Sequence, residues 1–144
     1  MKKFILLMII AVLTASTACS DDLKTTDVNK LPTKAQQYLK NFSSPVSLIE
    51  IDENLISDDT YEVILADGTE VEFNADGEWR SIDCQHTSVP TLFVPKSISD
   101  YVSNHFANLK IVKIKIERRG YDVELSNDIE LKFDKNGNFV KIDD

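Results

Sequence analysis

The sequence predicts an α+β fold of two tandem repeats, each a helix followed by a four-stranded antiparallel meander, with the helices packed on one face of the sheet. The first observation is an internal repeat: residues 61–84 match residues 121–144 at a constant offset of 60, without a gap. A fixed internal period indicates that one supersecondary unit is used twice. The second observation is that each repeat changes from helical to alternating apolar periodicity along its length.

The two repeats are expected to share one hydrophobic core. A unit of about 55 residues rarely buries enough apolar surface to be stable alone. We therefore place a single domain over 31–144, made of repeats 31–84 and 94–144 joined by residues 85–93. Stability must come from packing, because Cys84 is the only cysteine in this range and no disulfide framework is available.

Each repeat is expected to open with a helix. Pro32 and Thr33 provide a start signal in the first copy, and Pro95 and Ser97 provide it in the second. Apolar residues then recur at helical spacing and form one stripe. The stripes are Ala35, Tyr38, Leu39 and Phe42 in the first copy, and Ile98, Tyr101, Val102 and His105 or Phe106 in the second.

Short alternating runs after each helix predict strands, and the turns between them set the register. Asn74–Gly77 and Asp134–Gly137 fit a type I turn that ends on a left-handed glycine. This register places Phe73 opposite Trp79, and Phe133 opposite Phe139. One face of the sheet then carries the aromatic and aliphatic residues that should meet the helices, including Trp79, for which core packing is favoured over ligand stacking.

The opposite face mixes charged and apolar residues, a pattern typical of a contact surface. Another interpretation is a solvated sheet face, in which the fourth strand bulges or the 85–96 connection covers the apolar residues. The candidate partner-binding residues are Glu62, Ile64, Glu70, Glu72, Arg80, Ile82, Glu130 and Lys132, with Val140 and Ile142 on the same face.

The amino terminus has the pattern of an export signal. Lys2 and Lys3 precede an apolar run that is too short to span a bilayer, so residues 1–18 are interpreted as a signal peptide. Residues 16–19 resemble a bacterial lipobox, which predicts lipidation of Cys19 and a polar tether over 19–30. Ser16 replaces the commoner leucine, and ordinary cleavage after Ala18 is the alternative. The acidic residues after Cys19 resemble the tract that directs Bacteroidetes lipoproteins to the surface of the outer membrane.

The charge balance excludes nucleic acid as a partner. Removal of Lys2 and Lys3 from the 16 basic residues leaves 14 against 24 acidic residues, a net charge of −10. Nucleic acid requires clustered Lys and Arg, and an anionic membrane surface would repel the domain. Attachment to a membrane would therefore be through the lipid.

The whole domain resembles the PepSY-like family of secreted bacterial proteins, which is similar to the β-lactamase inhibitor protein. The resemblance rests on YEVILADGTEVEF with DGEW and IDC, and on YDVEL, ELKFDKNGNFVKIDD and the paired LP and VP segments upstream. The family implies two helix-plus-sheet units whose strands form a broad surface, and in the inhibitor such a surface grips an enzyme. No inhibitory residue can be transferred to this chain.

Catalysis is not expected, because Cys84 and His86 do not form a nucleophile and base pair. Asp134, Asn136 and Asn138 have the first spacings of a calcium loop, but Phe139 stands where glycine is needed, so turn chemistry is favoured and neither metal nor cofactor is expected. The predicted function is a non-enzymatic envelope lipoprotein that binds another envelope protein, and the family resemblance suggests inhibition or modulation of an enzyme as the form of that binding. The alternative is a periplasmic sensor or a ligand-binding module for cations or small cationic ligands.

Overall fold

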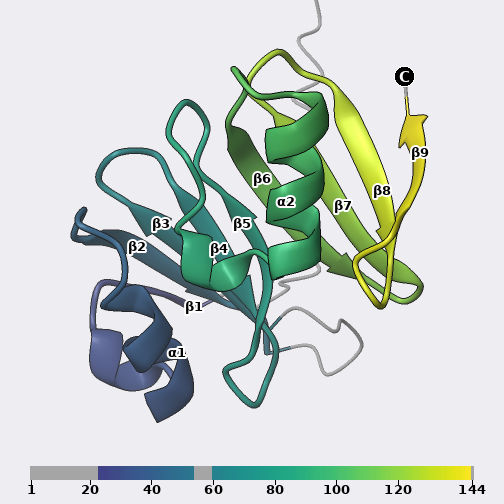
Figure 1. The fold of residues 1–144 in the computed structure, drawn as a ribbon. Coiled ribbons are helices and arrows are strands. Elements are labelled where there is room, and N and C mark those ends of the chain that lie inside the picture. Colours follow the sequence, from purple (N-terminus) through teal and green to yellow (C-terminus); the bar gives the residue numbers. More distant parts are fainter. Residues whose placement is uncertain (1–22, 54–59, 144) are drawn as a thin grey trace, which may run out of the picture.

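Residues 23–53 and 60–143 are described by the computed structural model, and they form mostly one nine-stranded antiparallel sheet (Figure 1). The order of the strands in the sheet follows their order in the chain. The strands are β1 (Leu23–Thr25), β2 (Val46–Ile51), β3 (Tyr61–Leu65), β4 (Glu70–Phe73), β5 (Trp79–Asp83), β6 (Ile111–Glu117), β7 (Gly120–Leu125), β8 (Glu130–Asp134) and β9 (Phe139–Asp143). The helices are η1 (Val28–Lys30), α1 (Thr33–Leu39), η2 (Thr91–Phe93) and α2 (Lys96–His105), of which η1 and η2 are 3-10 turns.

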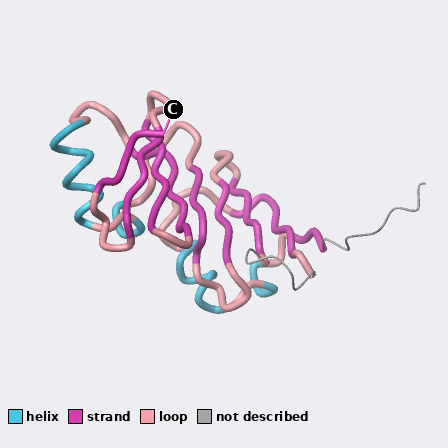
Figure 2. Tube along the Cα trace, turned by 90° about the vertical axis from the view of Figure 1, so that its right-hand side faces the viewer, coloured by secondary structure: helices cyan, strands magenta, loops and turns pink. Residues whose placement is uncertain are grey.

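The predicted fold class, two tandem helix-plus-four-stranded repeats, is wrong. Strand β5 pairs with β6 through Ser81 opposite Lys115, Ile82 opposite Ile114 and Asp83 opposite Lys113, so no edge separates the two meanders. Figure 2 shows the strands side by side in one continuous, twisted sheet. The described residues contain two α-helices, and both are short. The physical reason is that an open edge presents unpaired N–H and C=O groups, and pairing β5 with β6 satisfies them.

A ninth strand lies in the segment that we expected to be a polar tether. Strand β1 pairs with β2, with Lys24 opposite Glu50 and Thr25 opposite Ile49. Turn η1 follows directly, and the Asp27 carboxylate accepts a hydrogen bond from the Asn29 N–H at its start. The sheet therefore begins before the first helix.

The predicted hairpin registers are confirmed. Phe73 lies opposite Trp79, and Phe133 lies opposite Phe139. On their other side, the structure pairs Phe73 with Tyr61 and Phe133 with Tyr121. The turns of both hairpins end on a glycine with positive φ, 82° at Gly77 and 77° at Gly137. Both glycines lie against the start of a helix: an added Cβ would come within 2.8 Å of Pro32 at Gly77 and would clash with the Ser97 hydroxyl at Gly137. The repeat therefore fixes how each helix sits on its hairpin.

The core lies between the helices and one face of the sheet. Ala35 and Leu39 of α1, and Ile98 and Val102 of α2, are buried in the same cluster as the strand residues. The strand residues that they cover include Val63, Leu65, Val71, Phe73, Val123, Leu125, Leu131 and Phe133. This face is the one that the sequence predicts as buried.

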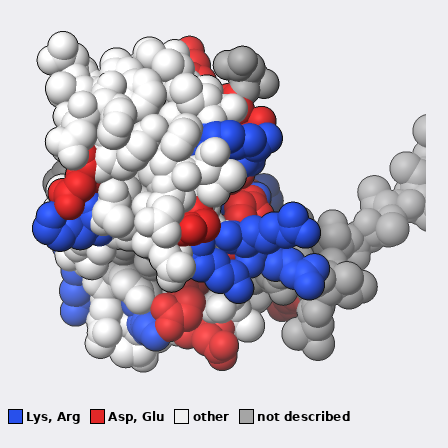
Figure 3. Space-filling view, turned by 45° about the vertical axis from the view of Figure 1, so that its right-hand side comes forward, with Lys and Arg blue, Asp and Glu red and all other residues white. Residues whose placement is uncertain are grey.

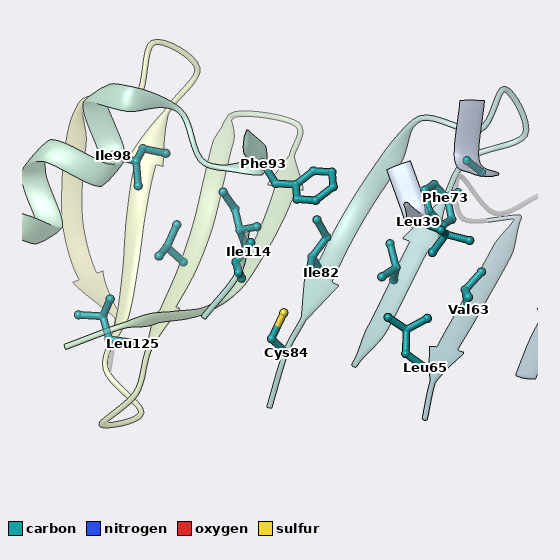
Figure 4. Packing of buried hydrophobic residues seen from close by; sticks show 14 of the residues in the cluster. Leu39, Val63, Leu65, Phe73, Ile82, Cys84, Phe93, Ile98, Ile114 and Leu125 are labelled. Carbon is teal, nitrogen blue, oxygen red and sulfur yellow. The ribbon is translucent and has the colours of Figure 1, made fainter. Parts of the chain in front are cut away.

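Phe93 of η2 joins the two halves of the core. Figure 4 shows it in the middle of the cluster, beside Ile82 and Ile114. Its ring centroid lies 5.5 Å from that of Phe42, 5.8 Å from that of Tyr38 and 5.7 Å from that of Trp79. The connection between the repeats thus packs into the core on the helix side, and it leaves the opposite face of the sheet uncovered.

Two predicted positions on the sheet, those of Ile82 and Ile142, are wrong. Ile82 was expected on the face opposite the helices, but it is fully buried on the helix side, opposite Val71 and Ile114. The cause is a bulge in β5: Glu72 pairs with Ser81 while Phe73 pairs with Trp79, so Arg80 is an extra residue. The equivalent bulge at Val140 moves Ile142 to the helix side, opposite Leu131.

Candidate functional site

The candidate site is the polar face, defined as the face of the sheet opposite α1 and α2. Cross-strand pairing places one side chain from each of the nine strands in a single row across it. The row is Lys24, Glu50, Glu62, Glu72, Ser81, Lys115, Asp122, Lys132 and Lys141. A second row runs beside it through Ile64, Glu70, Asp83, Lys113, Glu124, Glu130 and Asp143. Eight of the nine residues in the first row are charged. No row of side chains on the core-facing side of the described sheet has such a composition.

The acidic half of the polar face lies on β2–β5. Glu62 stands directly between Glu50 and Glu72, with Glu70 one row away. Lys24 pairs with Glu50 at 2.5 Å at the edge of this group. Partial burial, followed by repulsion from Glu70, Glu50 and Glu72, raises the pKa of Glu62 above the ordinary glutamate value. The fold therefore holds like charges together here, which favours a positively charged counterpart.

The mixed half of the polar face lies on β6–β9. Asp122 is the repeat equivalent of Glu62, but it stands between Lys115 and Lys132. The Lys132 ammonium lies 2.9 Å from Asp122 and 3.3 Å from Asp143. Hydrogen bonds to these two carboxylates raise the pKa of Lys132, and hydrogen bonds from Lys141 and Lys132 lower the pKa of Asp143. The same sheet thus presents an acidic half and a charge-paired half.

Two adjoining grooves hollow the mixed half. The larger has a volume of about 610 Å³, and its lining includes Arg118 and Arg119 of the β6–β7 turn and the apolar side chain of Val140. The smaller, of about 200 Å³, shares Glu117 and Asp122 with it. Within residues 23–53 and 60–143, neither arginine has an ion-pair partner. Figure 3 shows a large group of Lys and Arg with Asp and Glu at the right of the view, beside a broad uncharged surface, with smaller charged groups at the left and below.

The structure brings most of the predicted site residues together. Glu62, Ile64, Glu70 and Glu72 are cross-strand neighbours in the acidic half, and Glu130 and Lys132 lie in the mixed half. Arg80 lies in the β5 bulge, and Ile82 is in the core, so neither belongs to the rows. The prediction missed Glu50, Asp83, Lys113, Lys115 and Asp143. Asp122, the repeat equivalent of Glu62, is placed on this face by the alternation of its strand, although it is not among the candidate partner-binding residues.

The remaining candidates for chemistry have structural roles. Cys84 is buried, and burial raises the pKa of its thiol, which disfavours the thiolate. The His105 ring stacks on Tyr101, and its Nδ1 lies 2.9 Å from the Tyr101 carbonyl oxygen. The Asp134 carboxylate accepts backbone N–H groups of Asn136 and Asn138, both at 2.9 Å, as turn chemistry predicts. No cluster of three or more potential metal ligands occurs among the described residues.

Comparison with known proteins identifies the family. The sequence model of the family described as "Putative beta-lactamase-inhibitor-like, PepSY-like" matches residues 59–141. The chain belongs to this family, as its repeat motifs indicate. No curated protein matches the chain at a significant level.

Solved structures share both fold and sequence with this chain. A "putative periplasmic protein of unknown function" from Bacteroides vulgatus ATCC 8482 is 45% identical with a TM-score of 0.79, over 85% of this chain and 99% of that one. A "putative calcium-regulated periplasmic protein" from Bacteroides thetaiotaomicron is 38% identical with a TM-score of 0.80, over 86% of this chain and 98% of that one. A second Bacteroides vulgatus protein, also described as periplasmic, is 32% identical with a TM-score of 0.78, over 88% of this chain and 99% of that one.

Proposed function

We propose that this protein is an exported, non-enzymatic binding module that presents its polar face to another protein of the cell envelope. The observation that carries the proposal is the pair of charged rows that cross the sheet on the face opposite α1 and α2, where no helix of the described residues packs. The two halves differ in charge, which gives such a face electrostatic specificity. The three similar structures are all described as periplasmic, which supports export.

Lipid anchoring belongs to the same proposal. Cys19 and the rest of the signal and lipobox region lie outside the described residues, so the sequence pattern alone supports lipidation there. Among the described helices, none combines the length and the hydropathy needed to cross a membrane. A lipid on Cys19 would hold the domain at a membrane surface, within reach of envelope partners. Inhibition or modulation of an enzyme is the form of binding that the family description suggests.

The experiment is affinity capture from envelope extract with wild-type protein and two matched variants. Glu70→Lys with Glu72→Lys reverses two charges of the acidic half. Asp76→Lys with Asp100→Lys makes the same change in net charge at exposed positions away from the polar face. We expect a partner that is retained by the wild type and the control but lost with the first variant. A partner retained equally by all three would place the interface elsewhere and refute the role of this face.

A second candidate is binding of a cation or a small cationic ligand in the acidic half. It is favoured by the repulsion that Glu70, Glu50 and Glu72 exert on Glu62, which a cation would relieve, although the described carboxylates form no cluster that could hold a metal ion. One similar structure is described as calcium-regulated. Thermal melting with and without calcium separates the two candidates. A melting temperature that rises with calcium in the wild type but not in Glu62→Gln would support this second function.

A further inference from the structure

Among the described residues, the outer edge of β9 is left unpaired. β9 is the last strand of the sheet, and no strand in the described part of the chain pairs with its far side. Phe139, Val140 and Ile142 on this strand are 37%, 59% and 48% exposed, and they make up most of the exposed large hydrophobic residues described. Edge strands usually avoid such exposure, because an unpaired apolar strand is a template for pairing with another chain.

The internal repeat supplies a template for what covers such an edge. β5 is the repeat equivalent of β9, and β6 covers its outer edge, with Ile114 opposite Ile82 and Lys113 opposite Asp83. The Lys113 ammonium lies 3.4 Å from the Asp83 carboxylate. Ile82 is fully buried as a result, whereas its equivalent Ile142 is about half exposed. At the covered edge of β5, isoleucine therefore pairs with isoleucine and aspartate pairs with lysine.

The backbone hydrogen bonds between β5 and β6 support the same pairing for β9. The Cys84 N–H donates to the Val112 carbonyl at 2.8 Å. Alternate residues of an antiparallel strand direct their N–H and C=O groups to the same neighbour, so Ile82 also hydrogen-bonds toward β6. By the offset of 60, the N–H and C=O of Ile142 point toward the open edge.

A second copy of β9 fulfils all of these requirements. In an antiparallel pair centred on Ile142, this residue faces Ile142 of the other copy, Asp143 faces Lys141, and Lys141 faces Asp143. These are the isoleucine pair and the aspartate–lysine pair of the template, and the two-fold symmetry doubles the ion pair. We propose that the protein forms a two-fold symmetric homodimer through antiparallel pairing of its β9 strands.

The dimer would extend the polar face. Directly opposed residues of paired antiparallel strands lie on the same face of the sheet, so the two polar faces join into one surface with the mixed halves adjacent. The groove lined by Arg118, Arg119 and Val140 then occurs twice, on either side of the two-fold axis. A single strand pair buries little area, so we expect a weak, reversible dimer in about the micromolar-to-millimolar range.

The test is sedimentation of the full-length chain over a range of concentrations, in detergent so that the apolar residues 4–13 do not drive association. Four forms are compared: wild type, Ile142→Lys, Asp143→Lys, and Lys141→Asp with Asp143→Lys. Ile142→Lys sets two lysines face to face on the axis, and Asp143→Lys sets lysine against lysine twice. Both should weaken dimerisation by at least about tenfold, while the double exchange restores opposite charges and should recover it.

Circular dichroism and thermal melting of each form control for folding, since all three positions are exposed or half-exposed. A wild-type chain that is monomeric at every concentration would overturn the proposal and leave the edge to a strand of another protein. A dimer whose dissociation constant is the same in the wild type and in all three variants would place the interface elsewhere and would also overturn the proposal. Recovery by the double exchange is the result that a merely structural effect of the single variants would not produce.

Discussion

Glu62 and Asp122 occupy equivalent positions in the two repeats, yet neutralising them should change stability in opposite directions. Glu62 is flanked by Glu50 and Glu72, whereas Asp122 is flanked by Lys115 and Lys132. Glu62→Gln removes repulsion and should stabilise the domain. Asp122→Asn removes a partner of Lys132 that lies 2.9 Å from its ammonium, and it should destabilise the domain.

The sizes of these changes in the free energy of unfolding follow from the cross-strand geometry. Directly opposed like charges destabilise a sheet by about 0.2–1 kcal/mol each, and Lys24 partly offsets the charge of Glu50. We therefore expect Glu62→Gln to raise the free energy of unfolding by about 0.5–1 kcal/mol. Loss of the half-buried Asp122–Lys132 pair in Asp122→Asn should lower the free energy of unfolding by about the same amount. In a domain of this size these changes shift the melting temperature by roughly 2–6 °C up or down.

The pH dependence of the Glu62 effect has a defined sign. The folded state raises the pKa of Glu62, so between the ordinary value and the raised value the folded protein binds more protons than the unfolded chain. Stability contributed by this group therefore falls as pH rises through that window, and the full penalty applies above the folded pKa. Urea unfolding should show the gain from Glu62→Gln at neutral pH and lose it below the ordinary glutamate pKa of about 4.3. Changes of the same sign in Glu62→Gln and Asp122→Asn would refute the electrostatic account of the polar face.

Three further outcomes are expected. Phe73→Ala and Phe133→Ala should each reduce the free energy of unfolding by about 3–5 kcal/mol and unfold the chain in one transition by calorimetry, because both rings lie in one core; two separate transitions would show independent repeats. Phe93→Ala should be similarly costly, about 3–5 kcal/mol in urea unfolding, because its ring packs on three others across the junction; a loss below about 1 kcal/mol would mean that this ring does not join the halves. Cys19→Ser should move the intact domain from the membrane fraction to the soluble fraction, and a wild-type chain free of acyl groups by mass spectrometry would contradict lipidation.

Local features of the fold could be predicted because turn chemistry fixes them. The glycine that ends each four-residue turn determines which residues face each other, and so Phe73 and Trp79, or Phe133 and Phe139, could be paired from the sequence. The repeat supported each pairing independently. The side of the sheet that meets the helices followed from the same alternation.

The features that could not be predicted depend on non-local pairing. The strands β5 and β6 are separated by the connection and α2, so no turn motif signals that Ile82 meets Ile114. The bulge at Arg80 leaves only a break in the alternation, where Arg80 and Ser81 stand together before Ile82, so a bulge is one of the interpretations left open by the sequence. Together with the equivalent bulge at Val140, these features explain the wrong predictions: the fold class of separate repeats and the placement of Ile82 and Ile142 on the polar face.

The candidate site was predictable in its acidic half and poorly so in its mixed half. Glu62, Glu70 and Glu72 follow from hairpin alternation within one repeat. Lys113 and Lys115 become part of the face only because β6 continues the sheet beside β5. The joined sheet therefore creates a surface larger than either repeat could present.

The most direct test of a binding role for the polar face is lysine acetylation with and without the captured partner, read by mass spectrometry. Lys115 and Lys132 lie in the charged row across the sheet, while Lys96 lies on α2, on the opposite side. The account predicts that the partner protects Lys115 and Lys132 and leaves Lys96 unchanged, and that this protection weakens as salt is added. Protection of Lys96 with no change at Lys115 and Lys132 would contradict it.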